Sequence, residues 1–163
     1  MKGPRAPTDL HPTHIEDSPC ATYLRINRIF DCTATTLWAS LTTPPTMARW
    51  WYRTTGFTTT PGTRFHIEAP PVLVETHFCR RWNCVIDTVS EPEHVSIAIS
   101  TTDHNWLICF GLKPVNAGTE LTAVHAGFDE ARKSHRMARY IFKGIWTSQL
   151  DDLENLLSIK TLK

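Results

Sequence analysis

Two polar side chains, His125 and Arg28, fall where alternating apolar residues predict the inner face of a β-sheet. His125 shares its parity with Leu121 and Ala123 in the stretch 119–128, so the three side chains lie on one face of a strand. An imidazole on such a face has the chemistry of a general acid or base near neutral pH. A core histidine whose ring nitrogens bond to neighbouring groups fits the same pattern, and the sequence leaves both interpretations open.

Arg28 shares the parity of the apolar residues on either side of it. Because a buried unpaired charge is very costly, its guanidinium must meet an anion, a carbonyl or a ligand oxygen. A structural ion pair with Glu68, Glu75 or Asp87 would satisfy it equally well. If the interior carries out chemistry, we expect His125 to act as the acid or base and Arg28 to hold an oxyanion or a carbonyl.

Tryptophan is abundant, with six residues in 163, and each indole buries roughly 150–250 Å² when it lies inside a protein. Four of them could form an aromatic platform for a flat polycyclic ligand: Trp50, Trp82, Trp106 and Trp146. Ordinary core packing is the other interpretation, and it is favoured for Trp38 and Trp146. Because adjacent residues of one helix point in different directions, we expect Trp50 or Trp51 to be partly exposed or to cap the entrance of an internal cavity.

Motifs for metals, cofactors and covalent catalysis are missing from the sequence. His77, Cys79 and Cys84 do not match the spacing of a zinc site, and there is no glycine-rich phosphate loop, Ser/His/Asp order or carboxylate pair. The five cysteines include no CxxC pair and fall mostly in strand-like runs, which predicts buried free thiols in a reducing compartment. We therefore expect no metal and no cofactor.

Charge and hydropathy narrow the partners and the location. The chain has 17 Lys and Arg against 16 Asp and Glu, so it lacks the basic excess of a nucleic-acid-binding protein. No apolar run reaches the length of a transmembrane helix, and the first ten residues lack the apolar region of a signal peptide. Four prolines predict a flexible leader over 1–20, before a single domain over 21–163. We expect a cytoplasmic protein, monomeric or homodimeric, that binds neither nucleic acid nor a membrane.

Apolar periodicity predicts the elements that position these side chains. A strand over 21–32 leads into a short helix that Pro44 and Pro45 end, and a second short helix covers 46–52. The strands expected after them are 63–68, 72–78 (the weakest), 82–89, 95–100, 105–113 and 119–128. Because they follow one another with short turns, we expect them to pair antiparallel with their neighbours.

The last run, 132–160, has apolar residues three and four positions apart, the spacing of one helix face. They are Met137, Ile141, Phe142, Ile145, Trp146, Leu150, Leu153, Leu156 and Leu157. At about 1.5 Å per residue the helix spans about 40 Å, so it must lie across a broad apolar surface. The sequence therefore predicts an α+β fold, in which a curved antiparallel sheet of about six to seven strands wraps around a long C-terminal helix.

Three stretches carry a resemblance to a known superfamily. They are Leu24-x-Ile26-x-Arg28-x-Phe30 continuing through Leu37-Trp38 to Ala48-Arg49-Trp50-Trp51, Gly118-Thr119-x-Leu121-Thr122-x-Val124-His125-x-Gly127-Phe128, and Trp146-x-x-x-Leu150-x-x-Leu153. In order and spacing the chain resembles the SRPBCC superfamily, also called START-like or helix-grip. Within it the chain is similar to the polyketide cyclase-like branch named for the activator of the heat-shock-protein-90 ATPase. The resemblance spans 22–157.

The resemblance implies a deep apolar cavity between the sheet and the long helix. Ile145 stands where family members commonly have glycine, and this larger side chain would reshape the cavity. The stretch 69–81 also departs from the family pattern. The residues that we expect to line the cavity are Ile26, Arg28, Trp50, Phe65, Trp82, Ile97, Phe110, His125, Ile141 and Ile145.

Three functions follow as hypotheses from this fold. The first is a soluble carrier, sequestering or antibiotic self-resistance protein that binds an apolar, aromatic or polyketide-like small molecule. The second is a cyclase or dehydratase of natural-product biosynthesis, a lyase or isomerase that uses the same cavity. The third is an activator of a chaperone ATPase. Eukaryotic activators carry an additional N-terminal domain, whereas only about 20 residues precede the first expected strand, so we favour the third hypothesis least.

Overall fold

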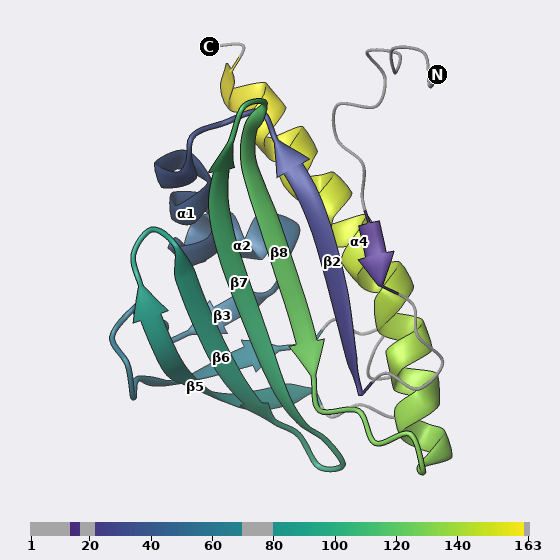
Figure 1. The fold of residues 1–163 in the computed structure, drawn as a ribbon. Coiled ribbons are helices and arrows are strands. Elements are labelled where there is room, and N and C mark those ends of the chain that lie inside the picture. The colour runs from purple at the N-terminus through teal and green to yellow at the C-terminus, as the bar shows by residue number, and fades with distance from the viewer. Residues whose placement is uncertain (1–13, 17–21, 70–79, 162–163) are drawn as a thin grey trace, which may run out of the picture.

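The structure is a computed structural model, and it describes residues 14–16, 22–69 and 80–161. Its strands are β1 (His14–Glu16), β2 (Tyr23–Phe30), β3 (Arg53–Thr55), β4 (Arg64–Glu68), β5 (Arg81–Ser90), β6 (His94–Ser100), β7 (Asn105–Val115) and β8 (Gly118–Ala126). Its helices are α1 (Ala34–Thr42), α2 (Pro44–Trp50) and α4 (Lys133–Thr161). A sheet covered on one face by helices confirms the predicted α+β helix-grip fold (Figure 1).

The described strands form one antiparallel sheet in the order β1-β2-β8-β7-β6-β5-β4-β3. Strands β4 to β8 follow one another as a meander, and β2 then pairs with β8, the strand farthest from it in the chain. In this register Leu24 lies opposite His125, and Arg28 lies opposite Leu121. The two polar residues singled out from the sequence therefore belong to neighbouring strands and lie on the same face of the sheet.

A β-bulge contributes to the curvature of the sheet. The register between β5 and β6 shifts between Ile86 and Thr88, which leaves Asp87 as the additional residue. A bulge of this kind bends its strand and increases the local twist. Figure 1 shows the sheet turning so that β3 runs across the direction of β8. The concave face that results holds α4.

The two short helices are joined through a single residue. Thr33 caps α1, because its side-chain oxygen accepts a hydrogen bond from the Thr36 backbone N–H at 3.2 Å. The prediction that Pro44 and Pro45 only end this helix is incomplete, since α2 begins at Pro44. Proline suits the first turn of a helix, where its missing N–H would have had no helical partner. The second helix therefore starts two residues earlier than expected and ends at Trp50 instead of 52.

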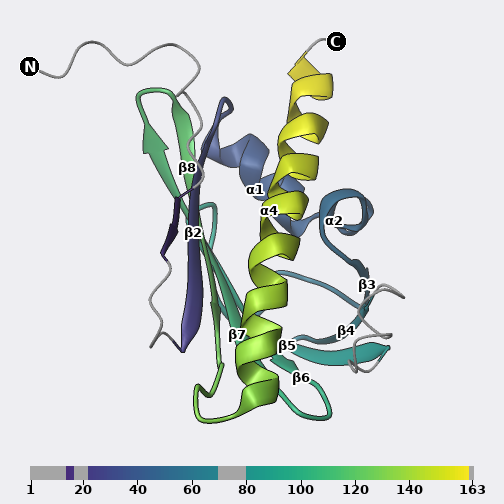
Figure 2. The same ribbon diagram turned by 90° about the vertical axis from the view of Figure 1, so that its right-hand side faces the viewer.

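The long helix α4 packs lengthwise against the sheet, with α1 and α2 next to it (Figure 2). Its buried inner stripe consists of Ala138, Phe142, Trp146, Leu150, Leu153, Leu156 and Leu157. This spacing of three and four confirms the predicted amphipathic face. Met137 does not belong to the stripe, since it is 55% exposed. It precedes Ala138 by one position, about 100° around the helix, and so points away from the sheet.

Two short strands were absent from the prediction. Strand β1 pairs with β2 from within the stretch expected to be a flexible leader, and β3 pairs with β4 at the other edge of the sheet. The expected strand over 72–78 lies outside the described residues. In the described part of the chain, none of the helices is both long enough and apolar enough to cross a bilayer.

Candidate functional site

The space between the sheet and α4 is occupied by a continuous set of rings, which we call the aromatic cluster. Its members are Trp50, Trp51, Tyr52, Trp82, Trp106, Phe110, His125, Phe142 and Trp146. Ring centroids of contacting members lie 4.7–6.5 Å apart, the range of edge-to-face and offset-stacked pairs. The cluster draws its rings from both the sheet and the helices, so it lies in the region where a cavity was expected.

Both adjacent tryptophans of α2 point into this cluster. Trp50 is 2% exposed and Trp51 is 7% exposed, with ring centroids 6.1 Å apart. The expected partial exposure of one of them is therefore wrong, whereas the other alternative, that one caps the entrance of a cavity, stays a prediction. Trp51 is the C-cap of α2 and has φ −118° and ψ −101°, which is not helical. Because the backbone leaves the helix at this residue, the 100° rotation between neighbouring side chains no longer applies.

His125 lies at the centre of the cluster and is 1% exposed. The indole Nε1–H of Trp146 donates a hydrogen bond to its Nδ1 at 3.1 Å. Since Nδ1 accepts, the proton of the neutral imidazole resides on Nε2. That Nε2 atom is buried and has no hydrogen-bond partner.

Indole N–H groups of the cluster are also buried without an acceptor among the described residues. The Nε1 atoms of Trp51 and Trp82 are buried without a hydrogen-bond partner. By contrast, Trp50 donates its Nε1–H to the Ser40 carbonyl oxygen at 2.9 Å, and Trp146 donates to His125. The buried N–H groups of Trp51, Trp82 and His125 therefore have no acceptor among the described residues, although most buried polar groups in proteins have a partner.

A hydroxyl group on the same face of the sheet is also unsatisfied. Thr54 in β3 lies opposite Ile67, which in turn lies opposite Trp82, so the three residues form one row across the strands. The Thr54 Oγ1 atom is buried and has no partner. Unsatisfied polar groups therefore extend from His125 in β8 to the edge of the sheet at β3.

Burial lowers the pKa of His125 to about 3, with a smaller contribution from His104. Burial also lowers the pKa of His104 to about 4, and His135 adds to the effect. The Trp106 ring lies between His104 and His125, 4.9 Å from each. Both imidazoles are therefore neutral at pH 7, and His125 meets the interior as an N–H donor without charge.

His135 has a structural role at the start of α4. Its Nδ1 accepts a hydrogen bond from the Asp129 backbone N–H at 3.0 Å, and its Nε2 lies 3.2 Å from the Asp103 carbonyl oxygen. With Nδ1 as acceptor, Nε2 carries the proton and donates to Asp103. The imidazole thereby connects the first turn of α4 to the β6–β7 loop, whose His104 stacks on the Trp106 ring of the cluster.

Arg28 is buried, at 4% exposure, and is paired with acids of α4. Its guanidinium lies 2.7 Å from Asp151 Oδ1 and 3.4 Å from Glu154 Oε2. The sequence suggested Glu68, Glu75 or Asp87 as the ion-pair partner of Arg28. Glu68 and Asp87 are wrong, because Arg28 forms its ion pairs with Asp151 and Glu154 instead. Glu75 lies outside the described residues. Arg28 lies four residues along the sheet from the level of His125, about 13 Å away. The structure therefore does not bring the two catalytic candidates together.

The other residues expected to line a cavity divide into two groups. Ile26, Trp50, Phe65, Trp82, Ile97 and Phe110 are buried on the concave side of the sheet or on α2. Ile141 and Ile145 are only partly buried, at the flank of α4. Their neighbours Phe142 and Trp146 occupy the inner face instead. The sequence reasoning missed three ring positions of the cluster, Trp51, Tyr52 and Phe142. For Phe142 the available signal was its spacing of four from Trp146.

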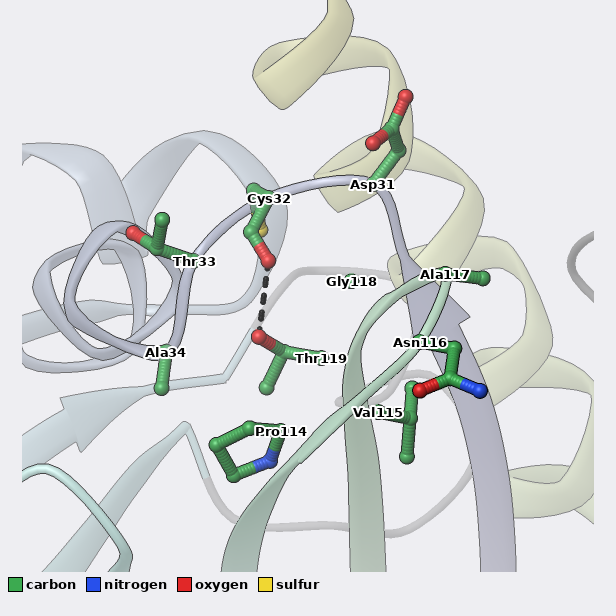
Figure 3. A pocket seen from close by; sticks show the side chains of 10 residues that line it. All are labelled: Asp31, Cys32, Thr33, Ala34, Pro114, Val115, Asn116, Ala117, Gly118 and Thr119. Atoms are coloured by element: carbon green, nitrogen blue, oxygen red, sulfur yellow. Dashed lines mark hydrogen bonds between the residues drawn. The ribbon is translucent and has the colours of Figure 1, made fainter.

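A surface hollow of about 620 Å³ lies where the β2–α1 connection meets the β7–β8 hairpin (Figure 3). It is lined by residues 31–34 and 114–119. Two of its polar side chains are engaged within the protein, since Thr119 Oγ1 donates to the Cys32 carbonyl oxygen at 2.8 Å and Thr33 caps α1, and no lining residue has a buried polar side-chain atom without a partner. The hollow therefore offers a ligand less unsatisfied chemistry than the aromatic cluster does.

A second hollow, of about 360 Å³, lies on the outer side of α4. It is lined by Lys133, Arg136, Met137, Tyr140 and Ile141. Ile141, which was expected to face the interior, therefore contributes to the outer surface.

The described residues contain histidines, acids and three cysteines, which are the residue types that bind metals or act as reactive thiols. That part of the chain contains no group of three or more His, Cys, Asp or Glu that could hold a metal ion. Cys32, Cys84 and Cys109 are free thiols. Burial is the main cause that raises the pKa of each, so these thiols stay protonated at neutral pH.

The family described as Activator of Hsp90 ATPase homolog 1-like protein matches residues 31–158. A search of curated protein sequences gives no match.

Solved structures share the fold. Protein MLL2253 from Mesorhizobium loti has a TM-score of 0.73 at 24% identity, over 83% of this chain and 96% of that one. CalU16 from Micromonospora echinospora has a TM-score of 0.67 at 17% identity, over 93% and 88%. DynU16, described as a protein of the dynemicin biosynthetic locus, has a TM-score of 0.67 at 13% identity, over 85% of this chain and 48% of that one. At these identities the similarity establishes the fold alone.

Proposed function

The chain belongs to the Activator of Hsp90 ATPase homolog 1-like family, and we propose that it binds an apolar, planar small molecule among the rings of the aromatic cluster. In this proposal the protein acts as a carrier, sequestering or self-resistance protein. The name of the family describes another member's activity and assigns no chaperone partner to this chain.

The unsatisfied donors of Trp51, Trp82 and His125 carry the proposal. Leaving a buried polar group without a partner costs about 1–3 kcal/mol. Three such groups cost a substantial share of the roughly 5–15 kcal/mol by which a domain is stable. A ligand that accepts hydrogen bonds from them would recover this free energy, and flat rings would stack against the indoles.

The rings that occupy the interior also define how a ligand is accommodated. The centroids of contacting rings lie 4.7–6.5 Å apart. A ligand that enters the cluster must therefore separate some of these rings and contact them itself. Because one aromatic contact replaces another, the exchange conserves buried apolar area. A planar aromatic ligand suits this exchange better than a flexible aliphatic chain does.

The state of His125 favours binding over catalysis. An efficient general base has a pKa near the working pH, whereas burial lowers the pKa of His125 to about 3. Its Nδ1 lone pair is also occupied by the Trp146 indole. Arg28, the other catalytic candidate, already has two carboxylate partners.

The described occurrence of DynU16 in a biosynthetic locus supports the class of ligand that we propose. It suits an aromatic or polyketide-like product or intermediate. The alternative function, a cyclase or dehydratase, is favoured by one observation, the unpartnered Nε2–H of His125, which could donate to a substrate carbonyl. Turnover that survives both His125→Ala and Arg28→Ala would exclude these residues as its catalysts.

The experiment for the proposed function is a titration of intrinsic tryptophan fluorescence with a panel of planar aromatic and polyketide-like compounds. We expect saturable quenching with at least part of the panel, because five of the nine rings in the cluster are indoles. Native mass spectrometry of the protein as purified provides a second readout, in which a bound molecule would appear as an added mass. The absence of saturable quenching across the panel would contradict the proposal.

A further inference from the structure

We infer that the ligand of the aromatic cluster is uncharged and carries hydrogen-bond acceptors, as a planar aromatic ketone does. This inference rests on the proposed function and specifies its ligand. It depends on three features of the interior: the kind of polar group left unsatisfied, the position of these groups relative to one another, and the absence of an available counter-charge.

The groups that carry this inference are donors. An indole N–H can donate but cannot accept, which settles the role of Trp51 and Trp82. His125 Nε2 carries the imidazole proton because Nδ1 accepts from Trp146, so it donates as well. The Thr54 hydroxyl can also donate. A ligand that satisfies this set must supply oxygen or nitrogen acceptors, and a hydrocarbon would leave every donor unpaired.

The donors surround a common group of rings. Trp82 and His125 both contact Trp106, at centroid distances of 5.2 and 4.9 Å, and both contact Phe142, at 6.3 and 4.7 Å. Trp51 contacts Trp146 at 6.5 Å, and Trp146 bonds to His125. A single planar molecule placed among these rings can therefore reach donors on more than one side.

The fully buried residues that the structure describes offer no free cation to an anionic ligand. Among the buried residues that the structure describes, Arg28 is the one with a permanently charged side chain, and Asp151 and Glu154 already neutralise it. His104 and His125 face the cluster as neutral imidazoles, because burial lowers the pKa of both. Transfer of a carboxylate from water to this site would cost several kcal/mol without compensation. An uncharged carbonyl compound avoids that cost.

The test compares four ligands with the same planar three-ring skeleton by quenching of tryptophan fluorescence at pH 7.5. They are 9-fluorenone, fluorene, 9-oxofluorene-4-carboxylate and the methyl ester of that carboxylate. We expect 9-fluorenone to bind about tenfold more tightly than fluorene, which corresponds to about 1.4 kcal/mol. We expect the neutral ester to bind at least about tenfold more tightly than the carboxylate, because the ester keeps the added bulk and removes the charge.

Variants connect the preference to named donors. Trp82→Phe and Trp51→Phe should reduce the ratio of the fluorenone and fluorene affinities, since each removes one N–H. Trp38→Phe provides the matched control, because Trp38 lies on α1, outside the aromatic cluster, and we expect its ratio to equal that of the wild type.

The possible results distinguish a failure of this inference from a failure of the proposed function. Equal affinities for fluorene and 9-fluorenone, a carboxylate that binds more tightly than its ester, or an unchanged ratio in both Trp82→Phe and Trp51→Phe would overturn the inference while the protein remained a binder. Failure of all four ligands and of the wider panel to give saturable quenching would overturn the proposed function itself.

Discussion

Trp50 and Trp82 are buried to a similar extent in one cluster, but only the Trp50 indole N–H has a partner, the Ser40 carbonyl oxygen. The same substitution at the two sites therefore has different consequences. Trp50→Phe removes a satisfied hydrogen bond and leaves a buried carbonyl without this donor, whereas Trp82→Phe removes a donor that was already unpaired. We expect Trp82→Phe to be less destabilising by about 1–3 kcal/mol. Denaturant unfolding of both variants without ligand measures the difference, and equal losses would indicate that Trp82 has a partner.

Arg28 leads to a second prediction, in which the two sides of an ion pair are not equivalent. Asp151 and Glu154 are 59% and 37% exposed, so they can be hydrated when Arg28→Met removes their partner. The double substitution Asp151→Asn with Glu154→Gln instead leaves a guanidinium that is 4% exposed without these counter-charges. We expect the double variant to lose about 3 kcal/mol or more, and Arg28→Met to lose less. Thermal unfolding of the two variants tests this order, and a greater loss in Arg28→Met would contradict it.

The buried imidazole of His125 predicts a dependence of stability on pH. Its pKa is about 3 in the folded protein, below the usual value of 6.5. Between these values the unfolded chain binds a proton that the folded chain does not, so the free energy of unfolding falls as the pH falls. The slope from this one group is about 1.4 kcal/mol per pH unit. We expect His125→Asn to remove that part of the slope between pH 6 and pH 4, as measured by urea unfolding, and an unchanged slope would contradict the assignment.

At the scale of single residues, the sequence predicted which face of the sheet a side chain occupies better than it predicted which residues the side chain contacts. Alternation along the strands placed Arg28 and His125 on the inner face correctly, because parity depends only on the pleat. It could not identify Asp151, Glu154 or Trp146 as their partners, because these contacts depend on the register between the sheet and α4. The unsatisfied donors were equally hidden, since an indole looks the same in the sequence whether its N–H is bonded or not.

At the scale of the elements, the β7–β8 hairpin depends on one glycine. Gly118 has φ +134°, and a Cβ atom there would lie 2.0 Å from the Phe30 carbonyl oxygen on β2. Gly62 has φ +85° but no atom within 4 Å of the equivalent position, so it provides a control for the backbone effect alone. We expect Gly62→Ala to cost about 1 kcal/mol and Gly118→Ala to cost at least about 3 kcal/mol, because the strand pair must also separate. Circular dichroism melts compare them, and equal costs would contradict this account of the hairpin.

Long elements with a regular apolar period were predictable, and short ones were not. Helix α4 was expected over 132–160 and is found over Lys133–Thr161, because its inner stripe repeats through many turns. The three-residue strands β1 and β3 are too short to show a period and form through pairing with their neighbours. The non-helical backbone of Trp51 was also outside the reach of periodicity, and it is this residue that places a second indole of α2 in the cluster.

At the scale of the whole molecule, the curved sheet and α4 enclose the aromatic cluster in the region where the fold resemblance implied a cavity. The architecture was predictable from the sequence, whereas the arrangement of the rings inside it was not. That arrangement depends on side chains from distant parts of the chain, and fold similarity leaves their identities undetermined. Trp51 comes from the end of α2, Trp106 from β7 and Phe142 from α4, and contacts between rings connect these elements.

The most direct test of the account is the ¹H–¹⁵N spectrum of the six indole Nε1–H groups, assigned by single Trp→Phe variants, during titration with 9-fluorenone. If a ligand binds among the rings and accepts from the unsatisfied donors, the signals of Trp51 and Trp82 should move progressively to saturation, whereas the signal of Trp38 on α1 stays in place. Saturable binding that leaves the Trp51 and Trp82 signals unmoved would place the ligand elsewhere on the protein and contradict the central claim.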